Sequence, residues 1–75
     1  MKEKFYLNEF QFFDGENTII FNIVEVNENN RTITVAVTRQ GKISVIEYDL
    51  FSDKKGLYFE YGAGGSEHIH VNDFE

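Results

Sequence analysis

The sequence predicts a single small all-β domain, with five to six antiparallel strands in a meander, a curled sheet or a small SH3-like open barrel. Apolar and polar residues alternate with a period of two along several segments, which is the spacing of side chains on one face of a strand. These segments are rich in Val, Ile, Thr, Phe and Tyr, which strands favour. Short clusters of Asn, Asp and Gly separate them, as expected of tight turns.

Residues 1–17 fit two structures. Asp14-Gly15 is a preferred two-residue hairpin turn, and it would pair residues 10–13 with the start of the next strand. The alternative is one short N-terminal helix that Asn8 caps and Gly15 ends. We favour the strand.

Residues 18–26 are apolar on both faces, which is typical of a central strand. Residues 27–30 then form a turn whose Asn residues tolerate positive φ. Residues 31–39 give the clearest alternation, and Ile33 and Val37 lie on its apolar face. We therefore expect a hairpin whose second strand buries one face.

The next turn contains Gln40 and Gly41. Gln is a poor residue for a type I′ turn, so we expect a type I turn closed by Gly41 in the left-handed region. The strand over residues 42–51 changes its apolar face midway, which predicts a β-bulge near Val45.

Residues 52–56 form the following turn and residues 57–61 the following strand. The Gly-rich segment 62–65 lacks the Lys-Ser/Thr of a phosphate-binding loop, so we interpret it as a flexible connection. A last short strand covers residues 67–71, with Ile69 facing inward.

The composition excludes several classes of function. The chain has 75 residues and no cysteine, so a disulfide, a thiolate metal site and a Cys nucleophile are excluded. Its 13 acidic and 7 basic residues give a net charge of −6, which argues against direct binding to a nucleic-acid backbone. We see no signal-peptide pattern and no apolar stretch long enough for a membrane span. We expect a cytoplasmic protein with no cofactor and no membrane partner.

His68 and His70 are two positions apart on a predicted strand, so both imidazoles can reach one metal ion. Residues 62–75 resemble the first metal-binding motif of the cupin family, with Gly62, His68, His70 and Glu75 at its glycine, histidine and glutamate positions. This resemblance implies a metal-binding, cupin-like protein that uses His68 and His70, although the family's second histidine motif is missing. The alternatives are a pair of solvent-facing histidines on an ordinary strand, or a pH-sensing pair.

Glu47 and Asp49 share a face of their predicted strand, and Glu60 or Glu25 can join them if the register allows. Like charges across a ladder are unfavourable, so such a cluster indicates a basic partner or a cation. One alternative function is an acidic DNA mimic that inhibits a nucleic-acid enzyme. A simpler explanation is a solvated face that keeps the protein soluble.

The chain has eight Phe and four Tyr residues, too many for one side of a small sheet. Because Tyr58 and Phe59 are adjacent on a strand, one of them faces away from the core. We therefore expect contact with a protein partner or a homodimer. The leading hypothesis is a non-catalytic protein-binding module, or a small accessory protein of the kind that phages and mobile elements encode. Its predicted aromatic and acidic surface contains Glu47, Asp49, Tyr58 and Glu60.

Overall fold

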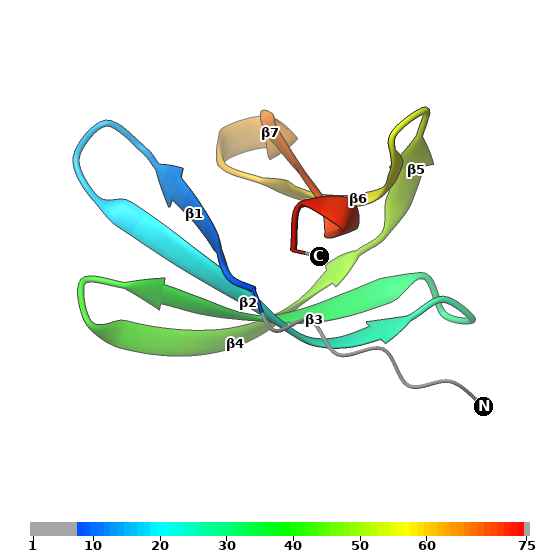
Figure 1. Cartoon of the computed structure of the whole chain (residues 1–75), viewed down its shortest axis with the longest axis horizontal. Helices are drawn as coiled ribbons and strands as arrows, with labels where there is room; N and C mark the ends of the chain where they lie inside the picture. The colour runs from blue at the N-terminus through cyan, green and yellow to red at the C-terminus, as the bar shows by residue number, and fades with distance from the viewer. Residues whose placement is uncertain (1–7, 75) are drawn as a thin grey trace.

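The computed structural model describes residues 8–74 and confirms the all-β class, with seven antiparallel strands in two sheets (Figure 1). The four-stranded sheet has the order β1-β2-β3-β4, and the three-stranded sheet has the order β5-β6-β7. Residues 8–74 form no α-helix and no closed barrel. No helix in this part of the chain is long and apolar enough to cross a membrane. The strands and 3₁₀ turns are β1 (Phe10–Phe13), β2 (Thr18–Asn27), β3 (Thr32–Arg39), β4 (Lys42–Asp49), β5 (Phe51–Asp53), β6 (Gly56–Tyr61), η1 (Ala63–Gly65), β7 (Glu67–His70) and η2 (Val71–Phe74).

The seventh strand arises because the strand expected over residues 42–51 is divided. β4 ends at Asp49, and β5 begins at Phe51 in the other sheet. Leu50 lies between them with its side chain buried, and its N–H donates a hydrogen bond of 2.8 Å to the carbonyl of Arg31. The buried leucine therefore anchors the point at which the chain crosses from one sheet to the other.

The N-terminal segment is a strand and not a helix, since β1 pairs in register with the start of β2. The predicted two-residue turn at Asp14-Gly15 is wrong, because a four-residue loop over residues 14–17 joins the two strands. Within it, the Asp14 carboxylate accepts hydrogen bonds from the backbone N–H groups of Asn17 and Glu16, at 2.8 Å and 2.9 Å. These bonds lower the pKa of the Asp14 carboxyl and stabilise the longer loop.

Two hairpin turns place residues other than glycine at positive φ. Arg31, and not the preceding asparagines, adopts φ 56° after β2. Gln40 and Gly41 both have positive φ, at 51° and 76°, so the β3–β4 turn is of type I′ and the type I prediction is wrong. Two-residue connections between paired strands favour type I′ and type II′ turns because their twist matches that of the strands, and this preference outweighs the local preference of Gln.

The bulge lies in β2 and not near Val45 as predicted. The β3–β4 ladder continues without a shift along all of β4, whereas the β2–β3 register shifts between Ile23 and Glu25. The change of apolar face in β4 has another cause. Ile43 and Val45 lie on the outer face of the four-stranded sheet, 69% and 65% exposed.

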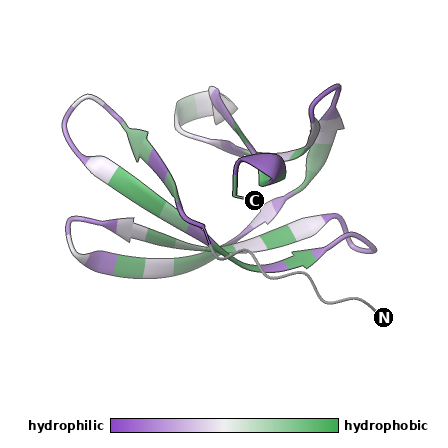
Figure 2. Ribbon diagram, in the orientation of Figure 1, coloured by the Kyte–Doolittle hydropathy of each residue, from purple (hydrophilic) through white to green (hydrophobic). Residues whose placement is uncertain are grey.

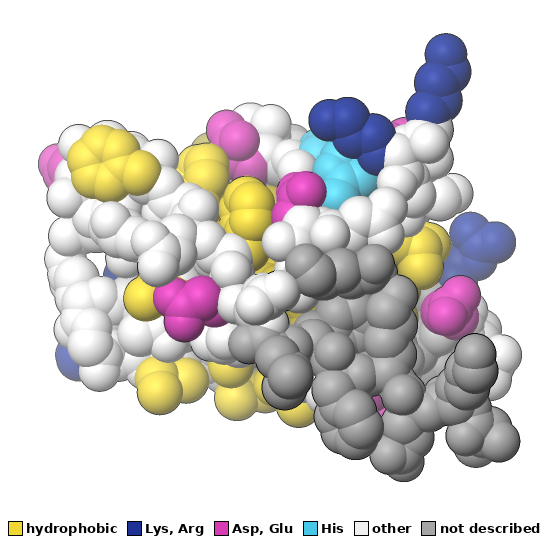
Figure 3. Space-filling view, viewed as in Figure 1, with side chains coloured by type: hydrophobic (Ala, Val, Ile, Leu, Met, Phe, Trp, Pro, Cys, Tyr) yellow, Lys and Arg dark blue, Asp and Glu magenta, His cyan; other side chains and the backbone are white. Residues whose placement is uncertain are grey.

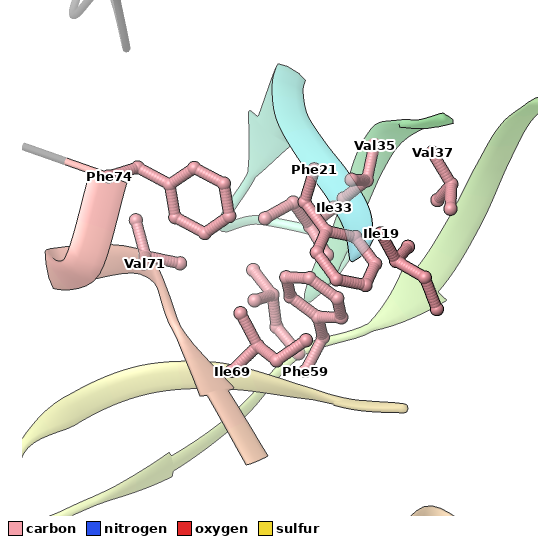
Figure 4. Close-up of a cluster of buried hydrophobic side chains, with 10 residues drawn as sticks. Ile19, Phe21, Ile33, Val35, Val37, Phe59, Ile69, Val71 and Phe74 are labelled. Atoms are coloured by element: carbon pink, nitrogen blue, oxygen red, sulfur yellow. The ribbon is translucent and has the colours of Figure 1, made fainter. Parts of the chain in front are cut away.

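The hydrophobic core lies between the inner faces of the two sheets (Figure 4). Hydrophobic and hydrophilic residues alternate along most strands (Figure 2). Phe21 of β2 and Phe59 of β6 pack edge to face across the core, with ring centroids 5.9 Å apart. The η2 turn contributes the fully buried Phe74, whose ring lies 5.8 Å from that of Phe10. The buried cluster comprises Ile19, Phe21, Ile33, Val35, Val37, Leu50, Phe59, Ile69, Val71 and Phe74.

Candidate functional site

The outer face of the three-stranded sheet brings together most of the residues that the sequence singled out. Residues directly opposite each other in an antiparallel ladder project from the same face. Tyr58 of β6 lies opposite both Phe51 of β5 and His70 of β7, and Glu60 lies opposite His68. Because Phe59 is fully buried, its neighbours Tyr58 and Glu60 point away from the core. We name the six residues of this surface the histidine face: Phe51, Asp53, Tyr58, Glu60, His68 and His70.

Tyr58 is the centre of the histidine face. Its ring stacks on the imidazole of His68, with centroids 4.4 Å apart and an interplanar angle of 18°. The rings of His70 and Phe51 lie 5.2 Å and 5.7 Å from it, both tilted. One continuous row of rings therefore crosses all three strands of the sheet.

His70 forms the closest polar contact between two side chains of the histidine face. Its Nε2 lies 2.9 Å and 3.1 Å from the two carboxylate oxygens of Asp53, so Nε2 carries the proton that is donated. Asp53 also accepts a hydrogen bond of 2.8 Å from the backbone N–H of Lys55. The hydrogen bond from His70 is the main reason that the pKa of Asp53 is lowered. His70 is buried, so the expectation that it faces solvent is wrong.

His68 remains exposed, and its Nε2 lies 3.6 Å from an oxygen of Glu60. On its other side the Glu60 side chain lies close to η1, since a Cβ atom added at Gly65 would be 3.0 Å from the Glu60 carboxyl group. The Gly-rich segment is thus more than a flexible connection. It forms a 3₁₀ turn, with the N–H of Gly65 donating to the carbonyl of Gly62 at 3.1 Å, and it packs on a residue of the histidine face.

The arrangement of the histidines bears on the predicted metal site. His68 and His70 do share a face, but each imidazole contacts its own carboxylate, and the Tyr58 ring packs against both. Within residues 8–74, no group of three or more His, Asp or Glu side chains is placed to hold a metal ion. Glu75, the last residue of the cupin-like motif, lies outside the described residues.

The acidic residues divide between the two sheets. Glu47 and Asp49 share the outer face of β4, as the alternation predicts. Thr34 of β3 lies between Glu25 of β2 and Glu47 of β4, and it is the direct cross-strand partner of both. The two glutamates therefore belong to one row across the four-stranded sheet. Glu60 is in the other sheet, next to His68, so the predicted surface residues Glu47, Asp49, Tyr58 and Glu60 form two surfaces.

Sequence reasoning missed two members of the histidine face, Phe51 and Asp53. β5 has only three residues, too few to show alternation, and the sequence pattern places Asp53 in a turn. Asp in front of Lys54-Lys55-Gly56 fits a hairpin turn, but its partner His70 lies 17 residues further along the chain. Only the pairing of β6 with both β5 and β7 brings the two together.

Comparisons of this chain with models of protein families, with curated proteins and with solved structures find no match. The resemblance of residues 62–75 to the cupin motif is therefore one of sequence pattern alone. The two open sheets of residues 8–74 also differ from the complete barrel that this family has.

Proposed function

We propose that this protein is a non-catalytic protein-binding module that contacts its partner through the histidine face. The observation that carries the proposal is the row of aromatic rings on the solvent side of the three-stranded sheet. Phe51 and the side chains of Glu60 and His68 are each 40–45% exposed. Aromatic side chains are enriched among the residues that dominate binding energy at interfaces.

The rings are held in place before any partner arrives. Strand pairing fixes β6 on both sides, Tyr58 stacks on His68, and Asp53 holds the ring of His70. A surface whose side chains are already ordered loses less conformational entropy on binding. This order supports a role in recognition.

The chemistry of the face indicates the kind of partner. The stacked rings of Tyr58 and His68 can accept an aromatic or guanidinium group, and the exposed Glu60 carboxylate can accept hydrogen bonds from a cation. The net charge of −6 favours the approach of a basic surface. A protein segment that presents an arginine meets all three requirements.

The shape of the molecule also supports binding over catalysis. A hollow of about 250 Å³ lies at the β3–β4 hairpin, where Val37, Arg39 and Lys42 are among its lining residues. No member of the histidine face lines this hollow. Active sites are usually concave, whereas a broad sheet face with stacked rings suits a protein surface.

Affinity capture from lysates of the source cells tests the proposal with matched charge reversals. Glu60→Lys changes the histidine face, and Glu47→Lys makes the same change on the other sheet. We expect the wild type and Glu47→Lys to capture the same protein. Glu60→Lys should capture at least tenfold less of it, which corresponds to a loss of about 1.4 kcal/mol in binding free energy. His68→Ala should weaken the same interaction. Equal capture by both charge reversals, or no specific protein with the wild type, would overturn the proposal.

A further inference from the structure

β4 is the longest free strand edge among residues 8–74. It has eight residues and pairs only with β3, whereas the other edge strands β1, β5 and β7 have four or fewer. All of β4 is exposed except the half-buried Tyr48. Native proteins usually shorten, charge or cover such an edge, because its unpaired backbone groups can pair with another strand.

The parity of the ladder shows which backbone groups of β4 are free. Arg39 and Lys42 close a two-residue type I′ hairpin, so they form a hydrogen-bonded pair. The even-numbered residues of β4 therefore direct their N–H and C=O groups at β3, and the bond from Leu50 N–H to Arg31 O has the same parity. The odd-numbered residues direct theirs outward, and these are Ile43, Val45, Glu47 and Asp49.

The side chains along this edge are apolar in its first half. Ile43 and Val45 are the two most exposed residues of the edge that carry large hydrophobic side chains, and no charge interrupts the segment from Ile43 to Ile46. Figure 3 shows hydrophobic side chains along the lower margin of the molecule, where Figure 1 draws β4. The segment from Ile43 to Ile46 thus lacks the charged residues that normally prevent strand addition.

The charges at the two ends of β4 identify the occupant. Lys42 begins the strand, and Glu47 and Asp49 end it. Two copies in antiparallel orientation bring the acidic end of each strand to the same end of the interface as Lys42 of the other copy, with the Lys42 side chain on the inner face and the carboxylates on the outer face. The Val45 residues of the two copies meet at the twofold axis. A parallel pair would place Glu47 beside Glu47 of the other copy, which is unfavourable.

We propose that two copies of this chain dimerise by antiparallel pairing of their β4 edges, with Val45 at the twofold axis. The two four-stranded sheets become one continuous sheet. On its outer face the two Val45 side chains pack on each other, and Ile43 of each copy lies diagonally next to Val45 of the other copy. This interface is isologous, as the symmetry of a dimer requires. It leaves the histidine face on the other sheet free, so it does not depend on the proposed function.

Disulfide cross-linking tests the register directly, because the chain contains no cysteine. In the proposed dimer Val45 of one copy lies opposite Val45 of the other copy in a hydrogen-bonded pair. The two Cα atoms are then about 5.5 Å apart, which is within disulfide range. We expect Val45→Cys to form a covalent dimer under mild oxidation at least tenfold faster than Ala36→Cys. Ala36 is the matched control, since it lies directly opposite Val45 on β3 and on the same outer face, one strand away from the edge.

Sedimentation of the cysteine-free protein provides the second test. We expect the wild type to sediment as a dimer of the 8.8 kDa chain and Val45→Lys to sediment as a monomer with an unchanged circular dichroism spectrum. Phe13→Lys, at an equally exposed site on the opposite edge strand β1, should remain a dimer. A wild type that stays monomeric at 100-fold increased concentration overturns the proposal, as does a dimer that persists in Val45→Lys or equal cross-linking rates at positions 45 and 36.

Discussion

Asp53 and His70 show how a single polar contact connects separate strands of this small protein. Asp53 lies at the end of β5 and His70 at the end of β7, so their hydrogen bond spans the whole three-stranded sheet. His70 is buried, while Asp53 is exposed at the surface. The bond satisfies a buried imidazole N–H that would otherwise have no partner, so its loss affects stability as well as the geometry of the histidine face.

The lowered pKa of Asp53 predicts a dependence of stability on pH. The hydrogen bond from His70 favours the ionised carboxyl of the folded state, whereas in the unfolded chain an Asp titrates near pH 3.9. The contribution of this group is therefore complete above about pH 4 and is lost as the pH falls through the lower, folded-state pKa. We expect Asp53→Asn to be less stable than the wild type at pH 7, and we expect this difference to shrink as the pH falls below 4. Thermal melts between pH 7 and pH 2 measure it, and parallel profiles for the two proteins would contradict the assignment.

Residue-level preferences predicted part of the local structure correctly. The alternation over residues 31–39 predicts that Ile33 and Val37 lie on one apolar face, and both are buried. The conformations of the turn residues are harder to predict, because Gln40 adopts the left-handed region against its own preference. There the pairing of two whole strands decides the turn, and a four-residue window of sequence does not contain that information.

At the scale of elements, strands with long alternating patterns were predictable and short ones were not. The central position of β2 and its pairing with β1 are confirmed. The sequence does not predict the division of residues 42–51 into β4 and β5, because Leu50 continues the apolar pattern of the strand. Only the presence of a second sheet shows that Leu50 is buried at the crossing between the two sheets. The predicted bulge failed for a related reason. It assumed that all apolar residues of β4 face one core, whereas Ile43 and Val45 are exposed.

The candidate site was predictable in the same uneven way. Tyr58, Glu60, His68 and His70 were all singled out, and the structure brings them together on one face. Glu47 and Asp49 lie on the other sheet. Sequence alternation assigns a face within a strand, but it cannot tell which strands become neighbours, so the grouping needed the three-dimensional structure.

The η1 turn gives a prediction for the element that supports Glu60. Gly64 and Gly65 both have φ near 70°, so alanine is strained at either position. A Cβ at Gly65 meets the Glu60 side chain at 3.0 Å, whereas a Cβ at Gly64 meets nothing within 4 Å. We expect Gly64→Ala and Gly65→Ala each to lose roughly 1 kcal/mol of stability from backbone strain, and Gly65→Ala alone to displace Glu60 from His68.

Nuclear magnetic resonance of the His68 ring distinguishes the two variants. Gly65→Ala should shift the His68 resonances, and Gly64→Ala should leave them close to those of the wild type. If both variants shift them equally, the turn acts on His68 through the backbone and not through contact with Glu60.

At the scale of the whole molecule, two sheets are joined by one crossing at Leu50 and by the packing of their inner faces. A 75-residue chain buries only about 60% of its unfolded surface. Each buried aromatic therefore carries a large part of the stability. Phe74 is notable because it lies at the end of the described chain but contacts Phe10 of β1, so it connects the C-terminal turn to the first strand.

Phe74→Ala tests whether this terminal contact is part of the cooperative core. Removing a fully buried phenylalanine typically costs about 3–5 kcal/mol, out of a total of roughly 5–15 kcal/mol for a small domain. We therefore expect Phe74→Ala to lower the midpoint of urea unfolding strongly, or to leave the chain largely unfolded at 37 °C. Phe13→Ala is the matched control, because the same side chain is removed from a site that is 65% exposed, and it should change stability by less than about 1 kcal/mol. Comparable losses in the two variants would mean that η2 does not close the core in solution. A large loss for Phe74→Ala alone would show that β1 and the C-terminal turn unfold together with the two sheets as one unit.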